Sequence, residues 1–217
     1  MSKKTYQSIF LHGFRGVGKS TVGKAVAKKL NWRYIEMDEQ IVTTAGKSVA
    51  ELTKQGTDWQ TFRQWEQHVL QDCLQQTQVV VSTGGGACVN AIIKDGTDQT
   101  FGELNAALVK NAPGVLGVLL TASIDVILQR IKAQEMEKAE TTRPILNEAK
   151  AKKVQALLAQ YAHAPQKQKE ILVNEIVEDN RSMYIARQPL YATLSEHVVD
   201  TGRLTVEDAV NKVLSFI

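Results

Sequence analysis

Short apolar runs alternate along the chain with longer amphipathic segments. The short runs end in polar or glycine-rich stretches, a pattern typical of buried strands. They are "YQSIFLHG" (6–13), "WRYIEMD" (32–38), "QVVVSTGGG" (78–86), "GVLGVLL" (114–120) and "EHVVDTG" (196–202). The pattern therefore predicts five strands.

The segments between these runs carry apolar residues every three or four positions, which predicts helices. The segments are "KSTVGKAVAKKL" (19–30), "SVAELTKQ" (48–55), "WQTFRQWEQHVLQDCLQQ" (59–76) and, at the end of the chain, "TVEDAVNKVLSFI" (205–217). Ser48 and Glu51 have the spacing of a capping box. Strands that alternate with helices predict a parallel sheet covered on both faces, with ligands at the carboxyl ends of its strands.

Composition narrows the class of protein. With 217 residues and a formal charge of +3, we expect one domain spanning residues 1–217. The basic residues are interspersed with acids, a balance that suits small anionic ligands better than nucleic acid. Cys73 and Cys88 have no C-x-x-C spacing, and no apolar run reaches membrane-spanning length. We therefore expect a cytoplasmic protein with neither a membrane nor a nucleic-acid partner.

The stretch "GFRGVGKST" (13–21) follows the first predicted strand and opens the first predicted helix. It matches the phosphate-binding pattern G-x-x-x-x-G-K-[ST] through Gly13, Gly18, Lys19 and Ser20. Backbone N–H groups and the positive helix end would hold the phosphates, Lys19 would reach the outer ones, and Ser20 would ligate Mg²⁺. The sequence therefore predicts binding of a nucleoside triphosphate.

Two classes of phosphate-loop protein lack their expected signals here. A switch GTPase needs Asn-Lys-x-Asp, but Asn211-Lys212 is followed by Val213 and Leu214 within a predicted helix. A machine-type ATPase usually has an Asp after an apolar strand, whereas "VVVSTGGG" ends in glycines. We therefore expect an enzyme in which a small acceptor lies beside the nucleotide.

Candidate acceptor residues follow the later strands. Glu36 and Asp38 stand two positions apart at the end of the second predicted strand, so we expect both to point the same way from its edge. Arg63 and Glu66 are three apart and share a helix face. Gly84–Gly86 expose backbone that a ligand can approach closely.

Two further arginines stand beside prolines. Arg143 opens "RPIL", and Arg187 opens "RQPLY". Each predicts a cationic side chain at a proline-marked break in the chain.

Taken in order, "GFRGVGKST", "EMD", "FRQWE", "TGGG", "RPIL" and "RQPLY" resemble the motifs of the shikimate kinase family. The resemblance spans about residues 8–203. It implies a three-layer P-loop fold like that of nucleoside monophosphate kinases, with a five-stranded parallel sheet in the order 2-3-1-4-5. It also implies a substrate-binding region at about 36–66 and a lid at about 134–150. Because Arg143 stands beside Pro144 in a polar stretch, we expect this lid to close on ligand binding. Residues 147–180, rich in Ala, Lys, Gln and Glu, predict an inserted pair of helices broken near Pro165.

The resemblance implies transfer of the γ-phosphate of ATP, with Mg²⁺, to the 3-hydroxyl of shikimate, in the pathway to chorismate. It assigns catalytic roles to Lys19, Asp38 and Arg143, and a water-mediated metal contact to Glu36 beside Ser20. Nucleotide contacts would come from Gly16, Val17, Gly18, Lys19, Ser20, Thr21, Arg130 and Arg203. Shikimate contacts would come from Asp38, Arg63, Gly84, Gly85, Gly86 and Arg187.

The match departs from the family in four places. Glu36 stands where the family usually has Asp, and "TDW" follows Gly56 where the family has the Glu of a compact G-E-x-x-F. Segments 89–114 and 147–180 are longer than usual. The second segment would alter lid motion, form a dimer contact or add only surface; a monomer is expected, with a dimer left open. Two alternative functions remain: a related kinase with gluconate as acceptor, and a non-catalytic nucleotide-binding regulatory protein.

Overall fold

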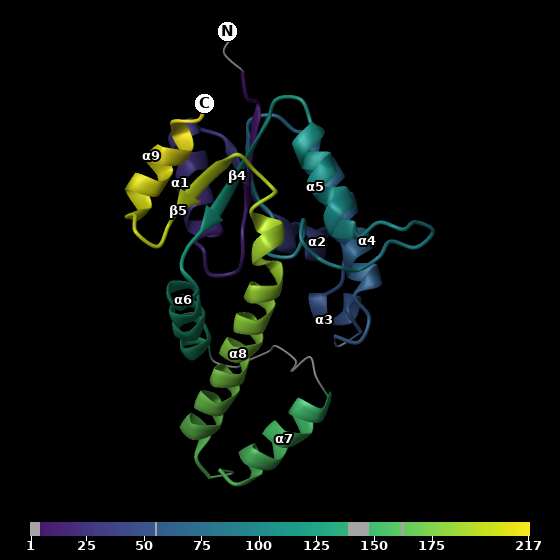
Figure 1. Cartoon of the computed structure of the whole chain (residues 1–217), viewed down its shortest axis with the longest axis vertical. Helices are drawn as coiled ribbons and strands as arrows, with labels where there is room; N and C mark the ends of the chain where they lie inside the picture. Colours follow the sequence, from purple (N-terminus) through teal and green to yellow (C-terminus); the bar gives the residue numbers. More distant parts are fainter. Residues whose placement is uncertain (1–4, 55, 139–147, 162) are drawn as a thin grey trace.

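A parallel sheet organises the chain, whose computed structural model describes residues 5–54, 56–138, 148–161 and 163–217 (Figure 1). Its strands are β1 (Ser8–His12), β2 (Arg33–Glu36), β3 (Val79–Ser82), β4 (Val115–Thr121) and β5 (His197–Asp200). All neighbours pair in parallel, in the order β2-β3-β1-β4-β5. The predicted fold class and strand order are confirmed, and all five carboxyl ends lie at one edge.

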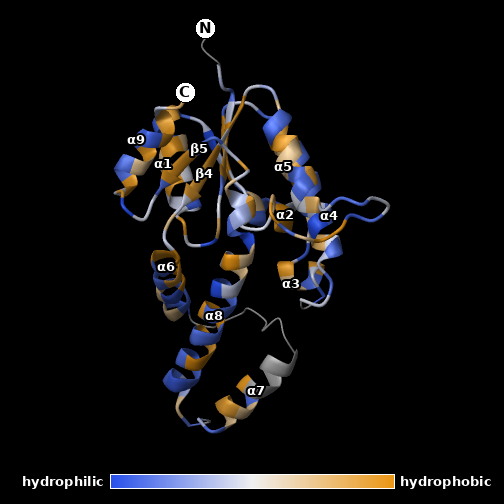
Figure 2. Cartoon of the chain, viewed as in Figure 1, coloured by the Kyte–Doolittle hydropathy of each residue, from blue (hydrophilic) through white to orange (hydrophobic). Residues whose placement is uncertain are grey.

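Helices cover both faces of this sheet. On one side lie α1 (Lys19–Leu30) and α9 (Val206–Leu214), and on the other α4 (Gln60–Leu74) and α5 (Phe101–Asn111) (Figure 1). Because side chains alternate along a strand, Ile9 and Leu11 of β1 join one hydrophobic cluster while Phe10 joins the other. Figure 2 accordingly shows the strands mainly in hydrophobic colours. The sheet is a rigid platform for its carboxyl edge.

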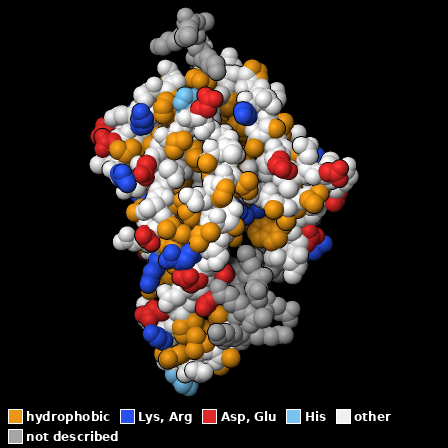
Figure 3. All heavy atoms as spheres, in the orientation of Figure 1, with side chains coloured by type: hydrophobic (Ala, Val, Ile, Leu, Met, Phe, Trp, Pro, Cys, Tyr) orange, Lys and Arg blue, Asp and Glu red, His pale blue; other side chains and the backbone are white. Residues whose placement is uncertain are grey.

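The remaining helices lie toward that edge or beyond it (Figure 1). They are α2 (Met37–Ala45), α3 (Val49–Leu52), α6 (Ile124–Glu137), α7 (Glu148–Ala159) and α8 (Pro165–Tyr191). In Figure 1, α6, α7 and α8 extend below the sheet. None of the helices in the described ranges is long and apolar enough to cross a bilayer. Figure 3 shows acidic and basic side chains intermingled over one face of the molecule.

Within the described residues, the predicted inserted segment contains α7 and α8, and this second helix begins with Pro165 in its first turn. This second helix does not end near residue 180. It continues to Tyr191, so the insertion and the "RQPLY" motif share one 27-residue helix. Pro189 lies in the last turn of α8, where little helix remains to be disrupted, and so marks no break before Arg187.

The expected placement of Asp38 on a strand is wrong. Strand β2 ends at Glu36, and α2 begins at Met37, so Asp38 lies in the first turn of a helix. Two carboxylates, Asp38 and Glu39, occupy that turn, where the helix dipole favours negative charge. Glu36 and Asp38 therefore point in directions set by two different elements.

Candidate active site

The phosphate-binding loop joins β1 to α1. Gly18 is the N-cap of α1 in a left-handed conformation, with φ of 91°, and a Cβ on Gly13 would lie 2.2 Å from the carbonyl oxygen of Leu120. Helix α1 has no side-chain N-cap and no acidic residue in its first turn. Its first N–H groups and the positive end of its dipole thus suit a phosphate.

Lys19 lies within this loop. Its Nζ donates hydrogen bonds to the carbonyl oxygens of Gly13 and Phe14, at 2.9 and 3.1 Å. Burial lowers the pKa of Lys19, while Asp38 and Glu36 act in the opposite direction. Since both hydrogen-bond partners are neutral carbonyls, a phosphate would be a stronger partner for the ammonium group.

The other residues of the predicted loop lie between β1 and α1 or in the first turn of α1. Gly16 has a φ of 82°, Val17 is buried in the core, and Thr21 is exposed in the first turn of α1. The loop therefore offers mainly backbone groups, together with the side chains of Lys19, Ser20 and Thr21.

Ser20 and Glu36 meet at the ends of α1 and β2. Ser20 Oγ donates to Glu36 Oε2 at 2.6 Å, and the Tyr34 hydroxyl donates to the same oxygen at 2.5 Å. Burial raises the pKa of Tyr34, as does its hydrogen bond to Glu36. Hydroxyl and carboxylate oxygens are the ligands that hard divalent cations prefer, so this pair fits such an ion.

Two carboxylates converge on Gly84. A Cβ on Gly84 would lie 2.8 Å from Asp38 Oδ1 and also 2.8 Å from Glu66 Oε1. Asp38 is exposed, whereas the Glu66 side chain is 1% exposed and its Oε1 has no hydrogen-bond partner in the described part of the chain. Burial raises the pKa of Glu66, and the nearby Arg63 opposes that shift. This end of the glycine turn is rich in acceptors and suits hydroxyl groups.

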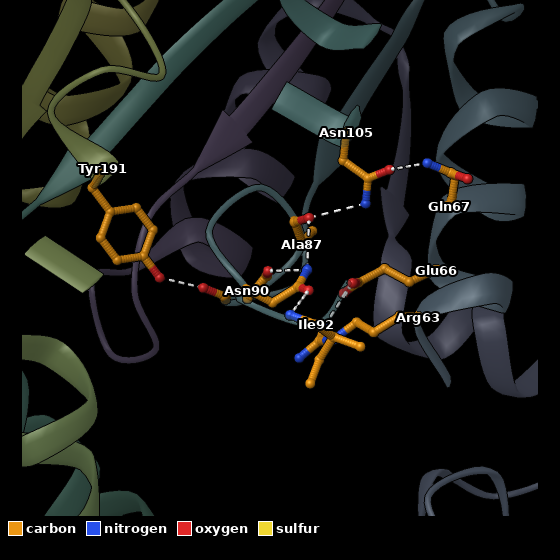
Figure 4. A network of polar contacts seen from close by, with 10 residues as sticks. Arg63, Glu66, Gln67, Ala87, Asn90, Ile92, Asn105 and Tyr191 are labelled. Carbon is orange, nitrogen blue, oxygen red and sulfur yellow. Dashed lines mark hydrogen bonds and ion pairs between the residues drawn. The ribbon is translucent and has the colours of Figure 1, made fainter. Parts of the chain in front are cut away.

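Two guanidinium groups converge on Gly86. A Cβ there would lie 3.0 Å from Arg63 Nη2 and 3.2 Å from Arg187 Nη1. Arg63 is buried, and its Nη1 donates to Glu66 Oε2 at 2.6 Å (Figure 4). Burial lowers the pKa of Arg187, as does the nearby Arg63. Two cations over one glycine favour an anion, and guanidinium groups match a carboxylate bidentately.

Gly85, the middle residue of the turn, binds α8 directly. The Tyr191 hydroxyl donates a hydrogen bond to its carbonyl oxygen (Figure 4), and the Tyr191 ring lies edge-on to Phe14 of the phosphate loop, with centroids 6.4 Å apart. Tyr191 therefore ties α8, which carries Arg187, to the turn. The motif "RQPLY" contained this tyrosine, and Tyr34 stood two residues before Glu36, but neither partner was evident from the sequence.

Three predicted arginines differ in their placement. Arg130 of α6 donates to the carbonyl oxygens of Gly16 and Thr201, at 3.3 and 2.9 Å, and so braces the phosphate loop. Arg203 follows β5 with 89% of its side chain exposed, 3.6 Å from Asp200. Arg143 and residues 139–147 of the predicted lid lie outside the described residues.

Comparisons with known proteins find similar sequences over most of the chain. A family model described as shikimate kinase matches residues 15–217. Shikimate kinase of Geobacter sulfurreducens is 29% identical over 211 residues, covering 97% of this chain and 91% of the relative. Shikimate kinase 2 of Photorhabdus laumondii is 28% identical over 194 residues, covering 89% and 86%.

Solved structures share the fold. The crystal structure of shikimate kinase from Bacteroides thetaiotaomicron superposes with a TM-score of 0.65 at 26% identity, covering 96% of this chain and 97% of the other. Shikimate kinase from Acinetobacter baumannii in complex with shikimate gives a TM-score of 0.66 at 23% identity, covering 98% and 93%.

Proposed function

The chain belongs to the shikimate kinase family, and we propose that it transfers the γ-phosphate of ATP to the 3-hydroxyl of shikimate. The products are shikimate 3-phosphate and ADP, as the pathway to chorismate requires. The choice of acceptor rests on one observation: Arg63 and Arg187 converge over Gly86, beside the carboxylates that converge over Gly84. A hydroxylated carboxylate fits this arrangement, because its carboxylate can bind the arginines and its hydroxyl groups can bind the carboxylates of the protein.

In this proposal, shikimate lies along the glycine turn. Arg63 and Arg187 bind its carboxylate, and the exposed backbone of Gly84, Gly85 and Gly86 allows the ring to approach closely. Asp38 accepts a hydrogen bond from the 3-hydroxyl, orients its oxygen toward phosphorus and takes its proton as the bond forms. The bond from phosphorus to the bridging oxygen of ADP breaks, and ADP leaves with that electron pair.

The nucleotide occupies the phosphate loop. Gly16, Val17 and Gly18 contribute backbone contacts, and Lys19, Ser20 and Thr21 contribute side chains near the phosphates. We propose that Arg130 and Arg203 flank the adenine and that Arg143 neutralises charge on the group in transfer. Since phosphoryl transfer depends mainly on positioning and charge neutralisation, an arginine in this role is worth about a thousandfold in rate.

The family requires a divalent metal, and we propose Mg²⁺. Ser20 and Glu36 would hold it, with Glu36 acting through a water molecule and from a longer side chain than the family's usual Asp. The 2.6 Å contact between Ser20 Oγ and Glu36 Oε2 supports this pairing. When bound, Mg²⁺ neutralises the phosphate oxygens and helps to align them.

The test is ADP release by purified protein with ATP and Mg²⁺, measured with shikimate, with gluconate and without an acceptor. Shikimate-dependent release that Arg63→Ala loses supports the proposal. Arg33→Ala is the matched control, because Arg33 is an exposed arginine of β2, and this variant should retain activity. Turnover with gluconate instead favours the related kinase, and ATP binding without turnover favours the regulatory protein.

We propose that the enzyme acts in the cytoplasm as a monomer that needs neither nucleic acid nor membrane. Its interspersed surface charges support this proposal. Light scattering of the purified protein at assay concentration tests the monomeric state, which a stable dimer would contradict.

A further inference from the structure

The long connection after the glycine turn leads into α5, which packs back against the turn. Asn105 of α5 is fully buried, and its Nδ2 donates to the carbonyl oxygen of Ala87 at 2.9 Å. Its Oδ1 accepts from Gln67 Nε2 at 3.1 Å, and Gln67 lies on α4 next to Glu66 (Figure 4). Asn105 thus links the backbone just after Gly86 to the helix that carries Arg63 and Glu66.

Lys94, in the same connection, fixes the direction of this chain of hydrogen bonds. Its Nζ donates to Gln67 Oε1 at 2.8 Å. Because an ammonium group can only donate, Gln67 must present its NH₂ group to Asn105, and Asn105 must present its own NH₂ group to Ala87. The carbonyl of Ala87 can only accept, so every member is paired in one orientation.

A second side chain holds the same turn. Asn90 Nδ2 donates to the carbonyl oxygen of Gly86 at 3.1 Å, and its Oδ1 accepts from the backbone N–H of Ile92 at 3.2 Å. Helix α5 approaches Asn90 so closely that a Cβ on Gly102 would lie 2.5 Å from the Asn90 carbonyl oxygen. The backbone of the turn is therefore held at Gly86 by Asn90 and at Ala87 by Asn105.

We propose that Asn105 and Gln67 are positioning residues for the acceptor. They hold the backbone of the glycine turn at a fixed distance from Arg63 and Glu66. In this way they determine the affinity for shikimate without contacting it. The inference rests on the proposed function, because it assigns a role toward that acceptor. The long segment 89–114 then has a role as well, since it brings α5 back onto the turn.

The test is the acceptor KM of Asn105→Asp, which keeps the size of the side chain but, as a carboxylate, cannot donate to Ala87. We expect the KM for shikimate to rise about tenfold, within the range for one unsatisfied buried group. The KM for ATP should stay within about twofold and kcat within about threefold, because the phosphate loop is untouched. Gln67→Met breaks the same chain of hydrogen bonds one step earlier and should give the same pattern of KM values. It replaces Asn105→Asp as the test if that variant folds poorly.

Asn180→Asp is the matched control. Asn180 is buried on α8 and donates to the carbonyl oxygen of Ile176 at 2.7 Å, far along the helix from the turn. The Asn180→Asp variant should lower the melting temperature about as much as Asn105→Asp does, but it should leave the KM for shikimate unchanged. An unchanged KM in the Asn105 and Gln67 variants, an equal rise in the KM for ATP, or an equal effect of Asn180→Asp would overturn the inference alone. Absence of shikimate turnover in the unsubstituted enzyme would overturn both the proposed function and this inference.

Discussion

Arg63 and Arg187 reach the same small region of backbone from two helices, α4 and α8. Their nearest guanidinium nitrogens, Nη2 and Nη1, lie 3.0 and 3.2 Å from the point where a Cβ of residue 86 would stand. Glycine at this position therefore gives both arginines room beside the turn. The two positive charges of the site therefore lie beside a residue that has no side chain.

Gly86→Ala should consequently raise the KM for shikimate about tenfold or more, because the methyl group would push both guanidinium groups away from the carboxylate they bind. The KM for ATP should change little. Steady-state kinetics with each substrate varied in turn measures the two constants. Gly117→Ala in β4 is the control, since its Cβ would meet the His12 ring at an ordinary 3.6 Å. A normal shikimate KM for Gly86→Ala would argue against the carboxylate lying there.

The pair formed by Arg63 and Glu66 should matter for stability as well as for binding. Their side chains are 7% and 1% exposed, so Glu66→Ala leaves Arg63 buried without its carboxylate. We expect a loss of about 3 kcal/mol in the free energy of unfolding, measured in urea. The double variant Arg63→Met/Glu66→Leu should recover most of that stability while remaining inactive. If Glu66→Ala were as stable as the parent, the buried charge would have to be solvated in another way.

His12 should make the fold sensitive to acid. It is buried at the end of β1, where burial and then Lys19 lower its pKa from 6.5 to about 4. Between those two values the unfolded chain binds a proton that the folded chain does not, so the free energy of unfolding falls as the pH falls. The full difference is about 3 kcal/mol, since each pKa unit corresponds to 1.36 kcal/mol.

Urea unfolding at pH 7 and pH 4.5 checks this expectation. His12→Gln should lose about 2 kcal/mol less than the parent over that interval, because glutamine does not titrate. The control is His68→Gln, since His68 lies on α4 with 55% of its side chain exposed, and this variant should behave like the parent. Equal losses in all three proteins would mean that His12 gains a proton without unfolding the chain.

The sequence predicted those features that have a local signal. The phosphate loop, the five strands and the helix at 19–30 follow from glycine spacing and hydrophobic period. Cys73, which falls within the predicted helix at 59–76, is 1% exposed in the core. Helix α2 was missed because its nine residues bury only Met37 and Ile41, too few to establish a period.

Contacts between distant elements could not be predicted. Arg15 of the phosphate loop forms an ion pair with the buried Glu135 of α6, and Gln67 binds Asn105 across two helices. Such partners have no fixed sequence spacing, since only the packed fold brings them together. One signal was present but not used: Thr100 and Glu103 form a capping box at the start of α5, where Gly102 weakens the helix pattern.

Glu36 allows the metal proposal to be tested separately from the acceptor site. Its Oε2 accepts hydrogen bonds from Ser20 and Tyr34, so Glu36→Gln removes the charge and weakens both contacts. We expect the Mg²⁺ concentration for half-maximal activity to rise about tenfold or more, with a smaller rise for Tyr34→Phe, which loses only one orienting hydrogen bond. Activity titrated with Mg²⁺ at saturating ATP and shikimate gives this value. Glu39→Gln, an exposed carboxylate in the first turn of α2, is the control. A Mg²⁺ requirement unchanged by Glu36→Gln would assign the metal to the phosphates and Ser20 without Glu36.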